Sequence, residues 1–292
     1  MSGFDVKYAE YQRLFEERLE NFCNKLNCQP QILKESLIYS LKLGGKRIRP
    51  VLMLSFADLL GLDKNNVLNF ALALELIHTY SLIHDDLPEM DNDDFRRGKP
   101  SNHKVFGTGN AVLAGDGLLN TAYSILFTEC FNGDEFIYAS KYICDCAGIN
   151  GMIAGQSADL SHENDEEIDE NILDFIYLNK TAQLISASCI TPSILCKGKY
   201  YSDIKTFSRD LGFLFQLTDD ILDVEGSFEN VGKSIGKDVA EGKYTAVKLY
   251  GLEKSKVRAD LIADRCIKML EGIKGDTGFL KEFVYFIRQR IL

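Results

Sequence analysis

The chain has 292 residues, of which 46% are hydrophobic, and a formal net charge of −10 at pH 7. This length and apolar content suffice for a sizeable core, and we expect a single domain over residues 1–292. The acidic balance argues against nucleic-acid binding, which requires a basic stripe to meet phosphates.

The cysteines and the apolar runs bear on the compartment of the protein and on whether it crosses a membrane. Eight cysteines are present, without the paired spacing of a zinc site. No signal peptide precedes them, so we expect reduced thiols in a cytoplasmic protein. The charge-free run at residues 181–196 is too short and too rich in Ser, Thr and Gln to cross a bilayer, so we predict no membrane span.

The placement of the prolines predicts helices along most of the chain. The five prolines leave residues 101–191 and 193–292 without any. Apolar residues at helical spacing in such stretches favour helices over a turn-rich β fold. Strand signals are weak throughout, so we predict an all-α fold.

The first segment with chemical character is basic, at residues 44–50 (GGKRIRP). A helix predicted over residues 33–43 stops at its two glycines, and Pro50 suits the first turn of a helix that reaches about residue 60. Free amides and the dipole at a helix start favour an anion, and guanidinium groups match phosphate oxygens. The segment therefore predicts an anion site.

The next predicted helix, residues 66–86, carries a face that changes character along its length. Positions at steps of three and four begin apolar and end polar or ionisable: Val67, Phe70, Ala71, Leu74, His78, Ser81 and Asp85. The face that packs the core at one end therefore carries chemistry at the other.

A first acidic cluster follows in residues 83–98 (IHDDLPEMDNDDFRRG). Pro88 breaks the helix, because it cannot donate to the preceding turn, and the chain can then turn Asp91 back beside Asp85. Carboxylate oxygens suit Mg²⁺, which is usually shared between one or two carboxylates and substrate phosphates. We predict metal ligands at Asp85, Asp86 and Asp91.

A second acidic cluster, residues 215–223 (FQLTDDILD), lies on a helix predicted within residues 205–224. Asp219 and Asp223 are one turn apart and face the same way, so both can address one cation or a pair. One such motif is weak, but two clusters that each end an apolar face are much stronger. Together with the basic groups they imply two diphosphates, one bridged by metal and one bound by Arg and Lys alone.

These segments occur in the order and spacing of a known family. The chain resembles the trans-isoprenyl diphosphate synthases, specifically the bacterial short-chain type, over about residues 35–250. The resemblance rests on GGKRIRP, IHTYSLIHDDLPEMDNDDFRRGKPSNH, GMIAGQSADL, Lys180-Thr181, FQLTDDILDVEG and GKSIGKDVAEGKYT. It implies a single helical bundle around a central active-site cavity, the two clusters on facing walls, a homodimer, and Mg²⁺ as cofactor, with three ions.

The resemblance also implies roles for individual residues. Isopentenyl diphosphate would be held by Gly45, Lys46, Arg49, His78 and Arg97. The allylic diphosphate would be held by Arg96, Lys180, Thr181, Gln216, Lys233 and Lys243, of which Lys180, Thr181 and Gln216 would act near the reacting carbon. The metal ligands would be Asp85, Asp86, Asp91, Asp219, Asp220 and Asp223.

Product length is implied by residues about one turn before the first cluster. In the family they form the floor of the chain pocket, and here they are Tyr80 and Ser81. Tyr80 and the longer first cluster resemble bacterial farnesyl diphosphate synthases, so a fifteen-carbon product is expected. Because Ser81 is small, geranylgeranyl diphosphate is the alternative product. Two departures, Ala182 in place of a usual Gly and Pro192 in a predicted helix, lead us to expect local reshaping, with a kink or a helix end at the proline.

Three other functions compete with this interpretation. A metal phosphohydrolase of the HD type would use His78, His84 and Asp85, but it leaves GGKRIRP and DDILD unexplained. A non-catalytic partner subunit is expected to lose one or both acidic clusters, and this chain keeps both. A terpene cyclase would not need the second diphosphate site at Lys46 and Arg49.

Overall fold

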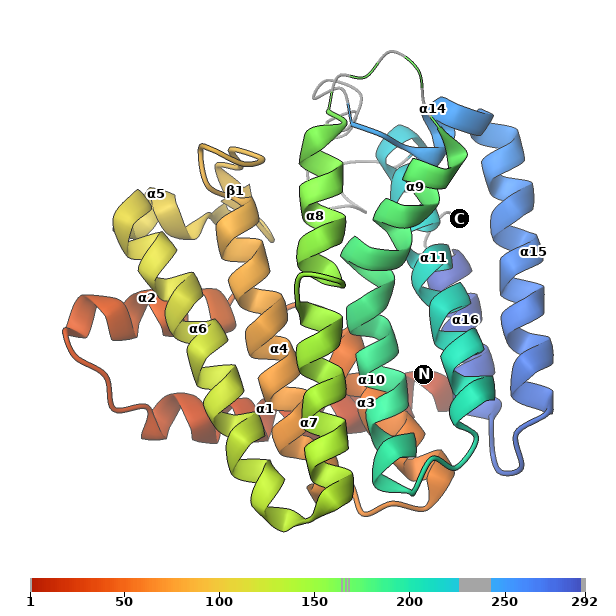
Figure 1. The fold of residues 1–292 in the computed structure, drawn as a ribbon, viewed down its shortest axis with the longest axis horizontal. Helices are drawn as coiled ribbons and strands as arrows, with labels where there is room; N and C mark the ends of the chain where they lie inside the picture. The colour runs from red at the N-terminus through yellow and green to blue at the C-terminus, as the bar shows by residue number, and fades with distance from the viewer. Residues whose placement is uncertain (1, 164, 166, 168, 226–242, 290–292) are drawn as a thin grey trace.

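The computed structural model describes residues 2–163, 165, 167, 169–225 and 243–289, and nearly all its elements are helices (Figure 1). The N-terminal half contains α1 (Gly3–Lys25), α2 (Gln31–Leu41), α3 (Ile48–Leu60), α4 (Asn65–Asp85), α5 (Asn102–Phe106), α6 (Thr108–Glu129), η1 (Cys130–Asn132) and α7 (Asp134–Ala147). The C-terminal half contains α8 (Met152–Ser161), α9 (Glu170–Ile176), η2 (Tyr177–Thr181), α10 (Ala182–Leu195), α11 (Tyr201–Glu225), α14 (Ala246–Tyr250), α15 (Leu252–Glu271) and α16 (Gly278–Gln289). Two short strands, β1 (Phe95–Arg96) and β2 (Lys99–Pro100), pair antiparallel. The predicted all-α fold is confirmed.

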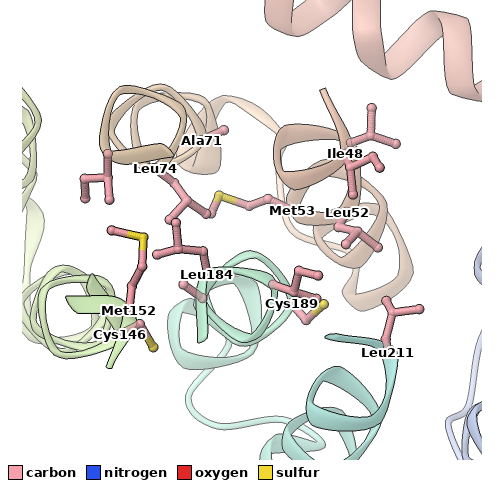
Figure 2. Packing of buried hydrophobic residues seen from close by; sticks show 14 of the residues in the cluster. Ile48, Leu52, Met53, Ala71, Leu74, Cys146, Met152, Leu184, Cys189 and Leu211 are labelled. Carbon is pink, nitrogen blue, oxygen red and sulfur yellow. The ribbon is translucent and has the colours of Figure 1, made fainter. Parts of the chain in front are cut away.

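Helices α3, α4 and α10 lie at the centre of the bundle, because they are apolar on nearly every side. In α10 each residue from Leu184 to Ser193 is buried. Figure 2 shows how Met53 of α3, Leu74 of α4 and Leu184 of α10 meet in one packed layer. One cluster of buried apolar side chains extends from α1 to α16.

Among the described residues, α4 is the one helix long and apolar enough to pass for a membrane span. However, 67% of its most apolar stretch is buried inside the protein. This burial is what the central helix of a packed bundle requires, and it accounts for the apolar sequence without a membrane.

The chain reverses after α4, as the proline predicted. The helix ends at Asp85, and the amide of Asp91 returns to donate to the carbonyl of Asp85 at 2.8 Å. Asn92 has a positive φ of 48°, which closes the turn. The β1–β2 hairpin follows at once and presents Arg96 to Asp86, whereas Arg97 in its turn reaches the carbonyl of Gly44.

Helix η2 is a π-helix that joins α9 to α10. It contains Lys180 and Thr181, so a widened turn presents these two predicted site residues. Ala182 follows it and packs against Gly212 of α11, where any Cβ would overlap that of Ala182. The chain thus accommodates the extra methyl group of Ala182 through a glycine on the facing helix.

Helix α10 continues through Pro192 and ends at Leu195. A helix end at the proline, one of the two expected outcomes, is therefore wrong, and a kink there stays a prediction. Pro192 lies in the last turn of α10, so the one backbone bond that it cannot donate, to the carbonyl of Ser188, is lost close to the end of the helix.

Candidate active site

The loop before α3 gathers basic groups under tight backbone control. Arg47 adopts a positive φ of 49°, and its buried guanidinium donates to Glu16 at 2.7 Å, to Glu75 at 2.9 Å and to the carbonyl of Leu41 at 2.7 Å. These three bonds engage each of the three nitrogens of the Arg47 guanidinium. It therefore fixes the loop and leaves anion binding to its neighbours.

Arg49, His78 and Arg97 converge beside this loop. The Nε of Arg49 is buried without a hydrogen-bond partner among the described residues, and burial lowers its pKa to about 10. Burial and the charges of Arg49 and Arg97 hold the pKa of His78 well below its usual value. Like charges so close together create a strongly positive site, which a polyanion would relieve.

Gly45 has a physical reason for its predicted role. Its φ is 126°, and a Cβ there would collide with the guanidinium of Arg97. Arg97 donates to the carbonyl of Gly44. Lys46 points elsewhere, and its ammonium lies 5.7 Å from the ring centroid of Phe286 in α16. The structure thus brings Arg49, His78 and Arg97 together, with Lys46 at the edge.

In the first acidic cluster, Asp86 differs from its neighbours. It is buried and accepts from the Nε of Arg96 at 2.9 Å and 3.3 Å through its two oxygens, and also from a terminal nitrogen of Arg96. Arg96 also lies 3.4 Å from Asp93. Such a two-pronged pair is geometrically rigid, so Asp86 and Arg96 hold the hairpin against the end of α4.

Asp85 and Asp91 lie near two lysines from the C-terminal half of the chain. Burial, and next the charge of nearby Lys180, act on Asp85 in opposite directions, and the net effect raises its pKa to about 6. The Nζ of Lys243 lies 3.3 Å from Oδ1 of Asp91. The ammonium of Lys180 is paired with Asp159 of α8. The ends of α4 and α8 and the helix η2 lie toward the same end of the bundle (Figure 1). Two predicted allylic-site lysines thus meet two predicted metal ligands.

Asp159 is a site residue that sequence reasoning missed. It is buried and anchors the ammonium of Lys180. The available signal was its position in GMIAGQSADL, a segment that supported the resemblance without being assigned any chemistry.

The predicted catalytic pair on η2 and α11 forms a hydrogen-bonded chain. Thr181 donates its hydroxyl to Oε1 of Gln216 at 2.7 Å, and Nε2 of Gln216 donates to Asp220 at 3.0 Å. Asp220 is buried and also accepts from the hydroxyl of Tyr177 and from the backbone amide of Ala246 at 2.8 Å. The second cluster is thus anchored through its middle carboxylate.

Asp219 and Asp223 lie half-buried on the neighbouring face of α11. The charge of Asp219 reaches Arg49 and favours its ionised form, which places the second cluster beside the basic site. Lys233 lies outside the described residues.

The donor set suits a hard divalent cation. Among the described residues, no group of three or more His, Cys, Asp or Glu is close enough to enclose a metal ion. Burial and the nearby charge of Asp91 both raise the pKa of Asp85, and a cation there would stabilise the carboxylate. All-oxygen ligands in ones and twos match Mg²⁺ shared with substrate phosphates, so the residues present fit the group.

Tyr80 and Ser81 lie one turn below Asp85 on α4. Tyr80 is buried, with its ring 5.7 Å from that of His84 in an edge-to-face arrangement. Ser81 donates to the carbonyl of His78 at 3.0 Å. His84 packs against Gly115 of α6 with its Nε2 3.1 Å from the carbonyl of Val112. This orientation gives no support to an HD-type site at His84 and Asp85.

A surface cavity of about 480 Å³ lies between α9, α11 and α15, lined by residues that include Phe213, Arg258 and Met269. None of the predicted site residues lines it. The convergence of charged groups, and not this cavity, therefore locates the candidate active site.

Comparison with known proteins defines the class first. The same helical fold occurs in a solved geranyltransferase from Helicobacter pylori in complex with magnesium and isoprenyl diphosphate. That structure superposes with a TM-score of 0.83 at 29% identity, over 99% of this chain and 97% of that one.

The family follows from the sequence. A model of the polyprenyl synthetase family matches residues 30–272, and the chain belongs to this family. It is 42% identical over 257 residues to a farnesyl diphosphate synthase of Micrococcus luteus, covering 87% of each. It is also 42% identical over 248 residues to a chloroplastic geranylgeranyl pyrophosphate synthase of Capsicum annuum, covering 84% of this chain and 67% of that one. The predicted family and trans-prenyltransferase class are confirmed.

Proposed function

We propose that the protein is a magnesium-dependent farnesyl diphosphate synthase, which condenses isopentenyl diphosphate with dimethylallyl and geranyl diphosphates. The observation that carries the proposal is the presence of two different anion sites. One combines Asp85 and Asp91 with Lys180 and Lys243. The other, around Arg49, His78 and Arg97, is basic, with Asp219 of the second cluster beside it. Two diphosphates with different requirements explain both.

The residues divide the work as follows. Lys180, held by Asp159, binds the allylic diphosphate, while Arg49 and Arg97 bind the second diphosphate. Bound Mg²⁺ would supply charge neutralisation on the departing diphosphate. Asp85, Asp91, Asp219 and Asp223 would hold it; Asp86 and Asp220, tied to Arg96 and Tyr177, orient the two walls. Three ions are implied by the family resemblance.

The group transfer balances without a side-chain base. The bond between allylic C1 and the diphosphate oxygen breaks, and its electron pair stays with diphosphate. The double bond of isopentenyl diphosphate supplies the pair for the new carbon–carbon bond. A proton then leaves C2 of that unit, and its electrons form the new double bond; the released diphosphate takes the proton. Apolar walls keep water from the cation.

The direct test is elongation by the purified protein. With Mg²⁺, labelled isopentenyl diphosphate and either dimethylallyl or geranyl diphosphate, we expect labelled farnesyl diphosphate by chromatography, and no product after chelation. Hydrolysis or cyclisation of the allylic substrate without elongation would contradict the proposal.

Product length depends on Tyr80 in this proposal. Its buried ring lies one turn below Asp85, where it would block a chain longer than fifteen carbons. Tyr80→Ala should lengthen the product, whereas Ser81→Ala, which enlarges nothing, should not. An unchanged product from Tyr80→Ala would contradict the role of Tyr80 as the floor of the chain pocket. A twenty-carbon product from the wild type would favour the geranylgeranyl alternative.

We also propose a homodimer in the cytoplasm. The support is a set of large apolar side chains exposed on α6, η1, α7, α8 and the loop between α7 and α8: Val112, Leu113, Phe127, Phe131, Ile137, Tyr138, Ile149 and Ile153. Exposed apolar groups gathered on neighbouring elements mark interfaces. The cytoplasmic location is supported by the eight cysteines, which are free thiols, as in a reducing compartment.

The dimer can be tested by light scattering. The wild type should give a dimer mass, and Phe127→Glu should lower it to that of a monomer.

A further inference from the structure

Gln156 of α8 has an amide that the folded chain leaves unsatisfied. Both its Nε2 and its Oε1 are buried without a hydrogen-bond partner among the described residues. A buried donor or acceptor left unbonded costs roughly 1–3 kcal/mol, so each such group in a native structure calls for a reason, such as a bound molecule. The roles assigned above make no use of Gln156.

The position of Gln156 on α8 is defined by two buried neighbours on the same face. Met152, one turn earlier, is buried and belongs with Leu74 and Leu184 to the apolar cluster of the interior (Figure 2). Asp159, nearly one turn later, pairs with Lys180. Three residues of helix rise place Gln156 about 4.5 Å below Asp159 along the axis. The amide therefore lies between the apolar interior and the charged end of the site.

The reacting carbons of an allylic substrate belong at this level. Its diphosphate is bound by Lys180 and the groups around Asp85 and Asp91, and its chain extends away from them into the apolar interior. C1 to C3 are the first carbons below the diphosphate. When the C1–oxygen bond breaks, positive charge spreads over C1 and C3, and a carbonyl oxygen at this depth stabilises it.

Gln216 carries the other side-chain amide near the proposed reaction site, and both of its polar atoms already make hydrogen bonds within the protein. Its Oε1 accepts from Thr181 and its Nε2 donates to Asp220, so its orientation is set by the protein. Gln156 has both polar atoms available at the same end of the bundle.

We propose that Gln156 is a further catalytic residue of the prenyl transfer. Its carbonyl oxygen faces the allylic carbons, and its amino group donates to the bridging oxygen that keeps the electron pair. This inference rests on the proposed function. A fixed dipole of this kind stabilises charge separation without reorganising during the reaction.

The test compares Gln156→Met, which keeps the length and removes both polar atoms, with Gln31→Met, whose amide pairs with Glu35 on the surface. For Gln156→Met we expect kcat about 10- to 100-fold lower, with KM for both substrates nearly unchanged. The melting temperature should stay level or rise, because no bond within the protein is lost. Gln31→Met should behave as the wild type.

A binding measurement separates catalysis from packing. An ammonium analogue that mimics the allylic cation, bound with inorganic diphosphate, is compared with its neutral isostere. Gln156→Met should weaken the ammonium analogue about tenfold and leave the isostere unaffected. Equal weakening of both, an unchanged kcat, or a large fall in melting temperature would overturn the inference. Failure of the wild type to elongate any substrate would instead defeat the proposed function.

Discussion

The two aspartate clusters hold their middle carboxylates with different partners. Asp86, in the turn after α4, is paired with Arg96 from the hairpin that directly follows it. Asp220, inside α11, accepts from the Tyr177 hydroxyl, the Gln216 amide and the backbone of Ala246. One anchor is charged and local in sequence, whereas the other is neutral and comes from three segments of the chain.

This difference shows how the two walls are stabilised. The first cluster is organised by its own turn, so its geometry depends little on distant packing. The second cluster depends on how η2 and the segment around Ala246 pack against α11. A charged partner also raises the cost of losing either member, because the survivor is left buried and unpaired.

The largest expected effect is the loss of activity when one carboxylate is replaced in either aspartate cluster. Asp85→Asn and Asp219→Asn should each lower kcat/KM about a thousandfold or more, since under the proposed function each would remove a ligand for the metal that neutralises the leaving group. Steady-state elongation assays measure this, with circular dichroism to verify folding. Near wild-type activity in either variant would remove that residue from the metal site.

The anchors themselves should differ in stability. Asp86→Asn should lower the free energy of unfolding by about 3–5 kcal/mol, because buried Arg96 loses its two-pronged partner and keeps only the 3.4 Å contact with Asp93. Asp220→Asn should cost only about 1–3 kcal/mol, because its donors are neutral. Urea unfolding measures both. The double variant Asp86→Asn with Arg96→Met should recover part of the loss; if it recovers none, the ion pair is not the cause.

A third change tests the second cluster, whose geometry depends on the packing of η2 against α11. Gly212→Ala should cost about 1–3 kcal/mol, because the new methyl group overlaps Ala182. Adding Ala182→Gly should restore stability and activity together. Persistent loss in the double variant would show that Gly212 matters for a reason other than its contact with Ala182.

The smallest expected effect tests one bond of the neutral anchor. Tyr177→Phe removes the hydroxyl that donates to Asp220 and accepts from Ala246, and should cost about 1 kcal/mol. In the Asp220→Asn background the same change should cost less, since the two groups act on each other. A full, additive cost in the double variant would contradict this coupling.

Much of the fold and the site was predictable because the signals are local. Glycine stops, proline starts and helical periodicity placed α2, α3 and α4 to within two residues at each end. The break at Pro88 predicted the return of Asp91 toward Asp85. These features depend on backbone chemistry that a short stretch of sequence contains.

What the sequence did not reveal depends on contacts between distant segments. Nothing in the motifs around Asp86 and Asp220 indicated that Arg96 and Tyr177 would be their partners, because folding sets these contacts. The pairing of Asp159 with Lys180 and the compensation between Ala182 and Gly212 have the same origin. The π-helical turn escaped prediction because its residues are compatible with an ordinary helix.

That π-helical turn makes the segment sensitive to length as well as to composition. A π turn contains one residue more than the α turn it replaces, and a single residue corresponds to about 100° of rotation. Deleting Leu178 would let the helix run on regularly, and it would turn α9 and Tyr177 away from Asp220 while Lys180 kept its direction. Substitutions at Leu178 and Asn179 are therefore expected to be tolerated better than any single-residue insertion or deletion in this segment.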